Sequence, residues 1–339
     1  MSAVFYSFIV PVFNRPDELA ELLGSLAQLN PERFEVVVVE DGSDILSDEV
    51  VSAFRGRLSI QYHQGERMGP ARARNKGMSL ATGEWFIFVD SDCLVPPEYL
   101  DLIDRSLEES PVDAFGGPDR AAPGFNATQQ AISYAMTSFF TTGGIRGGRR
   151  QVDRFYPRSF NMGVSRRVFE ETGGFPITRM HPGEDMVFSI ELVRRGFTTA
   201  CFYEAFVYHK RRTRFGQFFR QVFRFGKTRY IISRVYPDTF KPIYLMPSFF
   251  TMGVAGLILG GVFIHPWVLF PVGMYAFVLF SDALVRTRGV MISLLAAWAS
   301  FVQLTGYGLG FLATWFRVSM LGKDEYGVLN SGFYPTGQS

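Results

Sequence analysis

Residues 84–92 read Glu84-Trp85-Phe86-Ile87-Phe88-Val89-Asp90-Ser91-Asp92, an apolar run that stops at two carboxylates. Such a run predicts a buried strand. The strand would deliver Asp90 and Asp92 to the carboxyl edge of a parallel sheet, where open α/β sheets bind their ligands. An Asp-x-Asp triplet is common by itself, so its meaning depends on the sequence around it.

The residues on both sides of that strand alternate between β-rich runs and helix-length amphipathic segments. This alternation predicts parallel strands joined by crossover helices, and therefore an α/β domain with a mostly parallel sheet. The expected strands are Val4–Val12, Phe34–Val39, Ser59–His63, Glu84–Val89 and Ala200–Tyr208. The expected helices are Asp17–Leu29, Ser47–Arg57, Gly69–Ala81, Pro97–Glu109 and Gly183–Arg195.

The composition limits the class of protein. Apolar residues make up 47% of the 339 residues and charged residues only 19%, which is apolar for a soluble protein. The net charge of +2 is too small to indicate nucleic-acid binding. Cys93 and Cys201 are the only cysteines, each in an apolar stretch, so a disulfide scaffold is not expected and a reducing compartment fits best. The N-terminus predicts a first strand rather than a signal peptide.

The last third of the chain differs from the rest. Ile243–Ile264, Trp267–Val285 and Val290–Phe316 are apolar stretches long enough to cross a hydrocarbon core of ~30 Å. The alternative, core helices of a soluble domain, is disfavoured by three such runs in succession. Basic residues before Ile243 and between the second and third stretches predict a cytosolic N-terminal part and a C-terminus on the opposite side. Asp282 would then lie near the cytosolic end of the second span, where its cost is small.

A basic and aromatic segment, Arg214–Tyr236, precedes these stretches. Its composition predicts a helix in the membrane interface, with rings in the acyl boundary and cations near lipid phosphates. A nucleic-acid site has a similar composition, but the adjoining apolar stretches favour lipid.

Several acidic residues are candidates for chemistry. Asp90 and Asp92 could hold Mg²⁺ or Mn²⁺ on the diphosphate of a nucleotide sugar. Asp41 ends the second strand at the same edge and could accept a base N–H, although Asp and Gly also simply make turns there. Asp185, beside Glu184 at the start of a helix, could take a proton from an acceptor hydroxyl. Alternatively, both acids complement the helix dipole.

Basic residues near the same edge are the second group of candidates. Arg67–Gly77 combines a helix start with cations, among them Arg67 and Arg74, and suits phosphate charge as well as it suits a solvated helix face. His209 could be a third metal ligand, a diphosphate contact or a structural histidine.

The ordered set of motifs closely resembles the family 2 glycosyltransferases with the GT-A fold, over roughly residues 4–212. The set is far more specific than any one member. It consists of Phe8-Ile9-Val10-Pro11-Val12-Phe13-Asn14, Val39-Glu40-Asp41-Gly42-Ser43, Ala73-Arg74-Asn75-Lys76-Gly77, Asp90-Ser91-Asp92 and Gly183-Glu184-Asp185.

The resemblance implies a role for each motif. Asp41 would bind the base, Asp92 would contact the metal with Asp90 at its side, and Asp185 would be the catalytic base of an inverting transfer. Donor binding would also involve Pro11, Asn14, Arg67, Arg74 and Asn75, and the acceptor side would be formed by Asn161, Met162, Gly163 and Glu184. Processive membrane members carry Gln-x-x-Arg-Trp before a span. Gln221-Val222-Phe223-Arg224-Phe225 has Phe in place of that Trp, by relaxation of the motif or by coincidence.

Together these observations predict a GT-A domain (1–210), an interfacial helix region (211–242), three transmembrane helices (243–316) and a C-terminal tail (317–339). The expected activity is metal-dependent transfer from a nucleotide-diphosphate sugar, preferably a UDP-sugar, to a lipid or lipid-linked glycan at the cytosolic face of the inner membrane. The alternatives are a processive polysaccharide synthase, a nucleotidyltransferase and a non-catalytic membrane scaffold. Nucleic acid is not an expected partner.

Overall fold

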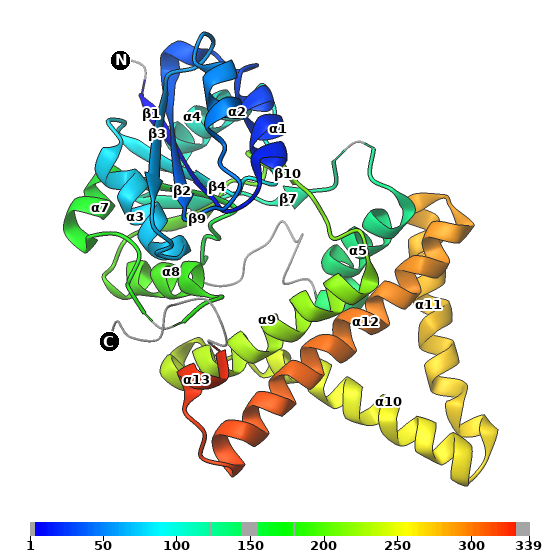
Figure 1. Cartoon of the computed structure of the whole chain (residues 1–339). Helices are drawn as coiled ribbons and strands as arrows, with labels where there is room; N and C mark the ends of the chain where they lie inside the picture. The colour runs from blue at the N-terminus through cyan, green and yellow to red at the C-terminus, as the bar shows by residue number, and fades with distance from the viewer. Residues whose placement is uncertain (1–3, 123, 144–154, 179, 330–339) are drawn as a thin grey trace.

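The computed structural model describes residues 4–122, 124–143, 155–178 and 180–329. A sheet domain occupies the upper part of Figure 1, and a group of long helices lies below it. The main sheet has the order β3-β2-β1-β4-β8-β6-β9. Its strands are β1 Tyr6–Val12, β2 Phe34–Asp41, β3 Ile60–Gly65, β4 Trp85–Val89, β6 Ala114–Gly116, β8 Asn161–Ser165 and β9 Thr199–Cys201.

The first four strands are parallel to their neighbours, whereas β8 pairs antiparallel with β4 and β6. This mixed sheet confirms the expected α/β class. The carboxyl ends of β1, β2 and β4 therefore meet at one edge, as the sequence predicts.

Apolar side chains on both faces of the sheet explain its three layers. In β4, Ile87 and Val89 pack into one core, and Phe86 and Phe88 pack into the other. The first core is covered by α1 Pro16–Leu26, α2 Asp48–Phe54 and α4 Tyr99–Glu109. The second is covered by α3 Pro70–Leu80, α7 Arg166–Thr172 and α8 Glu184–Arg194. A strand buried on both faces reads as a continuous apolar run, which is why its sequence could be recognised.

One expected strand is wrong in the structure. Ala200–Tyr208 is not continuous, because β9 ends at Cys201 and a separate strand, β10 Val207–His209, begins after a turn. β10 belongs to a small second sheet with β5 Cys93–Leu94 and β7 Asp119–Arg120. The break matters for the site, because the second sheet pairs His209 with Cys93, next to Asp92.

The helical part contains α5 Ala127–Thr137, α6 Phe139–Thr142, α9 Phe215–Val235, α10 Met246–Phe263, α11 Phe270–Thr287, α12 Val290–Trp315 and α13 Glu325–Leu329. Three helical segments, Pro242–Phe263, Pro266–Thr287 and Val290–Met320, are long and apolar enough to cross a membrane. α5 lies between strands in the sequence, yet it packs with α9, α11 and α12 rather than on the sheet.

Asp282 on α11 has partners that explain its place in an apolar helix. Its carboxylate accepts a hydrogen bond of 2.6 Å from the Tyr134 hydroxyl on α5 and pairs with Arg286 one turn later. Because the charge is neutralised locally, the helix keeps its apolar character elsewhere.

α9 and α12 approach closely because glycines line their contact. A Cβ on Gly226 of α9 would lie 2.1 Å from the Tyr307 carbonyl oxygen of α12. A Cβ on Gly310 of α12 would lie 2.1 Å from the Phe223 carbonyl oxygen of α9. Backbone therefore packs directly on backbone, as in other helix pairs with small interfacial residues.

We expect Gly226→Ala to lower the free energy of unfolding by about 1–3 kcal/mol, because the added methyl overpacks this contact. Thermal unfolding in detergent would measure the change. Gly216→Ala on the same helix is the matched control, since a Cβ there meets nothing within 4 Å. Equal stability of the two variants would contradict the close contact.

Candidate functional site

A cavity of about 440 Å³ lies at the carboxyl edge of the parallel strands. Its walls come from the ends of β1, β2 and β4, the starts of α3 and α8, and one face of α9. Among the predicted residues, Pro11, Asp41, Arg67, Arg74, Asp90, Asp92, Glu184, Asp185 and His209 line it. The structure thus gathers nine of the fourteen predicted site residues around one space.

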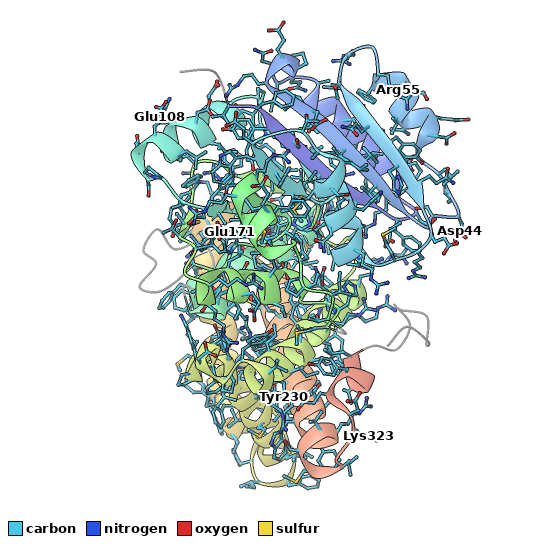
Figure 2. All side chains as sticks on the ribbon, turned by 90° about the vertical axis from the view of Figure 1, so that its left-hand side faces the viewer. Asp44, Arg55, Glu108, Glu171, Tyr230 and Lys323 are labelled. Atoms are coloured by element: carbon cyan, nitrogen blue, oxygen red, sulfur yellow. The ribbon has the colours of Figure 1, made fainter. Side chains whose placement is uncertain are left out.

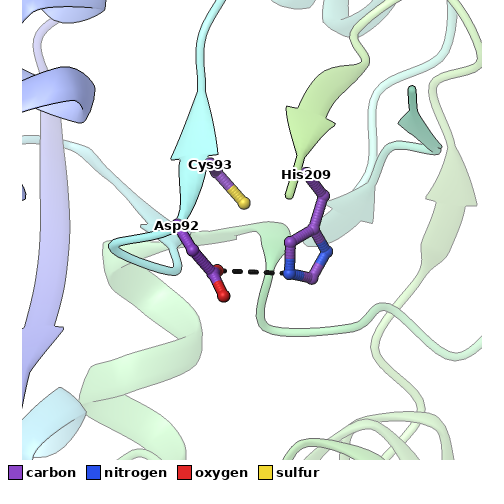
Figure 3. Close-up of side chains that lie close together, drawn as sticks. All are labelled: Asp92, Cys93 and His209. Carbon is purple, nitrogen blue, oxygen red and sulfur yellow. Dashed lines mark ion pairs between the residues drawn. The ribbon is translucent and has the colours of Figure 1, made fainter. Parts of the chain in front are cut away.

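Asp92 and His209 form the part of this cavity that resembles a metal-binding site. Nε2 of His209 lies 3.2 Å from Oδ1 of Asp92 (Figure 3). Arg15 contacts Oδ2 of Asp92 at 3.0 Å. Burial would raise the pKa of Asp92, but His209 and Arg15 lower it below its usual range. Burial likewise opposes the charged form of His209, while Asp92 raises the pKa of the imidazole.

Cys93 completes a possible metal-binding group with these two side chains. Its thiol is fully buried, and burial raises the pKa of Cys93 well above its usual value. A protonated thiol is a poor ligand, particularly for a hard cation such as Mg²⁺ or Mn²⁺.

The chemistry of Asp92 and His209 fits Mg²⁺ or Mn²⁺ better than a thiolate site would. Oδ1 of Asp92 is buried, and its contact with His209 Nε2 lacks hydrogen-bond geometry, so within the described part of the chain this oxygen makes no hydrogen bond. These cations are commonly held by one or two carboxylates together with substrate phosphates, so few protein ligands are needed. Asp90 is not in the Asp92–Cys93–His209 group and points instead toward Arg74.

Arg74 ties three elements together beneath the cavity. Its guanidinium contacts Asp90 at 3.2 Å and Glu184 at 3.0 Å, and its side chain is only 5% exposed. Burial opposes its charge, but the acids raise the pKa of Arg74 above its usual value. Glu184 also contacts His181 Nδ1 at 3.0 Å and is itself buried. These contacts of Glu184 hold the start of α8 in place. The neighbouring Asp185 pairs instead with Arg158.

Asp185 stands at the start of α8 with its carboxylate held in place. One oxygen accepts the Met186 backbone N–H at 2.7 Å, and the other pairs with Arg158 Nε at 2.9 Å. The Asp185 side chain is 13% exposed. Arg158 was not predicted as a site residue. Its position three residues before Asn161 was the only indication of such a role in the sequence.

The remaining predicted donor residues shape the rim. Oδ1 of Asp41 accepts the backbone N–H groups of Met68 and Gly69, which fixes the loop before α3. Asn14 has a positive φ of 54°, and its Oδ1 accepts hydrogen bonds from the backbone N–H groups of Asp44 and Ile45. Asn14 is thus a clamp between two loops and does not line the cavity.

Asn75 and the acceptor-side segment also lie outside the cavity. Asn75 exchanges hydrogen bonds with the backbone of Phe175, which anchors the approach to α8. Asn161, Met162 and Gly163 are in β8. Oδ1 of Asn161 accepts a hydrogen bond from the Tyr99 hydroxyl, and Gly163 faces the Phe115 ring. These three residues form the sheet behind the cavity, while Ser159 just before them reaches its wall.

Two arginines that were not predicted strengthen the case for an anion. Arg211 lines the cavity, is buried and pairs with Asp119 at 2.5 Å. Its Nε and Nη2 atoms make no hydrogen bond within the described residues. Arg212 lies beside it in the wall. Both belong to the basic run after His209, so the sequence did contain a signal for them.

The fold and this cavity define an α/β protein with a carboxylate-lined cavity at the carboxyl edge of its sheet, and comparison with known proteins gives its family. The model of glycosyl transferase family 2 matches residues 7–173. The N-terminal domain of this chain belongs to glycosyl transferase family 2 and has the GT-A fold.

Two relatives illustrate the match. Glycosyltransferase GlyG of Streptococcus pneumoniae is 31% identical over 114 residues, 33% of this chain and 38% of GlyG. Poly(ribitol-phosphate) beta-N-acetylglucosaminyltransferase TarS of Staphylococcus aureus is 38% identical over 99 residues, 28% of this chain and 17% of TarS. The matches thus cover well under half of these relatives.

A solved structure extends the likeness in fold. Mannosyltransferase PcManGT from Pyrobaculum calidifontis, in complex with GDP-Man and Mn²⁺, superposes with a TM-score of 0.55 at 17% identity. The superposition covers 92% of this chain and 88% of PcManGT.

We expect Arg74→Met to lower the free energy of unfolding by about 3–5 kcal/mol, because it leaves buried Glu184 without its cation. Lys76→Met on the same helix is the control and should stay within about 0.5 kcal/mol of the wild type. Chemical unfolding in detergent would compare them. A small effect at Arg74 would show that this ion pair is not what holds α3 to α8.

Proposed function

We propose that this protein is an inverting, metal-dependent glycosyltransferase that moves a sugar from a nucleotide-diphosphate sugar, preferably a UDP-sugar, to a lipid or lipid-linked glycan. The reaction takes place at the cytosolic face of the inner membrane. The observation that carries this proposal is the junction of the carboxylate cavity with a second, apolar cavity.

The second cavity has a volume of about 620 Å³ and lies between α6, α9, α10 and α12. Apolar side chains make up most of its wall, among them Phe139, Ile243, Phe250 and Leu304. Five residues line both cavities: Met136, Arg158, Gly183, Phe225 and Thr228. An apolar chain in one space and a polar group in the other can therefore belong to one acceptor molecule.

Donor binding is supported by the charges of the first cavity. The free N–H groups of Arg211 suit the oxygens of a diphosphate, because charged N–H donors bind such oxygens strongly. Asp92 and His209, with Asp90 nearby, would hold Mn²⁺ or Mg²⁺, and the bound cation would offset the charge that develops on the departing diphosphate. Asp41 would reach the base through Oδ2, which accepts one backbone N–H, from Gly69 at 3.1 Å.

Asp185 supplies the base of the proposed reaction. It lines the carboxylate cavity beside Arg158, which lines both cavities and holds one carboxylate oxygen. An acceptor hydroxyl that enters from the apolar side would give its proton to Asp185 and attack C1 from the face opposite the diphosphate. The anomeric configuration would therefore invert. Gln221 and Phe225 also line the cavity, so the segment that resembles Gln-x-x-Arg-Trp lies where an acceptor sugar would be placed.

Release of nucleoside diphosphate tests this function directly. Detergent-purified protein would be given UDP-, GDP- and dTDP-sugars with a membrane lipid extract, first with Mn²⁺ or Mg²⁺ and then with a chelator. We expect metal-dependent release from one donor, loss of release in Asp92→Ala, and a product with inverted anomeric configuration. Asp185→Asn should keep nucleotide binding within about twofold and lose transfer.

Other outcomes would identify the alternatives. Pyrophosphate in place of a nucleoside diphosphate would indicate a nucleotidyltransferase, and products longer than one added sugar would indicate a processive synthase. Failure to bind UDP or GDP in calorimetry would favour a non-catalytic scaffold. Loss of binding together with transfer in Asp185→Asn would place Asp185 in the donor site.

Filling the apolar cavity tests the acceptor separately. We expect Ile243→Trp to reduce kcat/KM for the lipid acceptor at least tenfold and to leave the Kd for UDP unchanged. Ile258→Trp on α10 is the matched control, because Ile258 is 50% exposed and does not line the cavity. An equal acceptor response of the two variants would contradict a lipid chain in this cavity.

A further inference from the structure

The chain after α12 returns to the helix that precedes the apolar segments. Lys227 Nζ of α9 donates to the Val328 carbonyl oxygen at 2.7 Å, and Arg234 Nε pairs with Glu325 at 2.6 Å. The Tyr230 hydroxyl lies 2.6 Å from Ser319 Oγ. Figure 2 shows Lys323 beside the part of α9 that carries Tyr230. Three contacts over two turns of α9 thus fix this C-terminal segment.

The second half of α9 is held against the sheet domain. Phe225 lies in the wall of the carboxylate cavity, and Thr228 Oγ1 donates to the Pro182 carbonyl oxygen at 3.0 Å. Just beyond its end, Asp238 pairs with Arg194 of α8 at 2.5 Å. Whatever lies on α9 therefore lies on the same side of a membrane as the sheet domain.

α12 runs beside α9 in the same chain direction. A Cβ on Gly306 would meet Val222, and the Phe311 ring lies 5.3 Å from that of Tyr230 further along. Figure 1 shows the two helices side by side. α9 carries five cations: Arg220, Arg224, Lys227, Arg229 and Arg234. If α12 crossed the hydrocarbon, α9 would be drawn in with it, and its charged side chains would be costly to place near the centre of the bilayer.

The number of crossings between α9 and α13 must be even, because both helices lie on one side. Three apolar helices separate them, so at least one helix does not cross. Residues Leu321–Asp324, which link the end of the α12 segment to α13, span at most ~14 Å and cannot return through a core of ~30 Å.

Burial identifies the helix that stays on the near side. In the most apolar stretch of Val290–Met320, which contains α12, 44% of the residues are buried within the protein. The corresponding fractions are 6% for Pro242–Phe263, which contains α10, and 11% for Pro266–Thr287, which contains α11. α10 and α11 present apolar side chains to the outside, including Phe263, Ile264 and Trp267 where they meet.

We propose that α10 and α11 form the membrane-inserted hairpin, whereas α12 lies with α9 at the membrane surface, on the face that bears the sheet domain. The segment up to Leu329 is then on that same face. This arrangement replaces three crossings, with a C-terminus on the opposite side, by one outward and one return passage. It does not depend on the proposed glycosyltransferase activity.

Cysteine labelling in membrane vesicles tests the proposal on the full chain. Lys323→Cys and Arg55→Cys place thiols at two exposed positions, one after α12 and one on the sheet domain. Wild-type protein gives the background from Cys93 and Cys201. With a membrane-impermeant maleimide, we expect both variants to label in the same vesicle orientation. Labelling of Lys323→Cys only in the opposite orientation would overturn the proposal.

A second measurement addresses the contact itself. A bifunctional maleimide should cross-link the double variant Arg234→Cys/Glu325→Cys in intact membranes, because these side chains are paired at the surface. A double variant with Glu108→Cys in place of Glu325→Cys should not cross-link, because Glu108 lies on α4 of the sheet domain, far from α9 (Figure 2). Absence of the first cross-link, when both of its thiols label singly, would also overturn the proposal.

Discussion

The arrangement of the site depends on the two ion pairs of the buried Arg74 guanidinium. It joins the end of β4, through Asp90, to the start of α8, through Glu184. These two places carry the other acids of the cavity, Asp92 and Asp185. A buried cation between two carboxylates is stable only if both partners stay in position, so the ion pairs fix the spacing of Asp92 and Asp185. Asp92 and Asp185 can then face the cavity without having to hold the domain together.

α9 plays the corresponding part on the membrane side. One face of it closes the carboxylate cavity, another lines the apolar cavity, and the glycine contact binds it to α12. The sheet domain and the apolar helices therefore meet along a shared element rather than through a linker. α5, which departs from the sheet to pack among these helices, adds a second connection.

Much of the fold followed from local sequence, because its strands are buried on both faces and end in turn residues. The edge that collects Asp41, Asp90 and Asp92 followed from parallel topology alone. The arginines around the cavity did not. Arg15, Arg158 and Arg211 pair from loops with Asp92, Asp185 and Asp119, and no periodicity marks such a loop residue. Asn14, Asn75 and Asn161 were recognised by motif, but their amides hold backbone segments in place, a distinction that needs coordinates. The number of membrane crossings stays a prediction from sequence, because hydropathy does not distinguish an apolar helix in contact with lipid from one in contact with protein.

Phe225 and Thr228 of α9 line both cavities, so one short stretch of this helix lies between the two spaces. If the proposed acceptor occupies both, its reactive hydroxyl and its first apolar carbons must lie on either side of that stretch. A molecule with a long polar stem would leave the apolar cavity empty whenever its tip reached Asp185. Under the proposed function, α9 would therefore select acceptors by the length of the polar headgroup as well as by its chemistry.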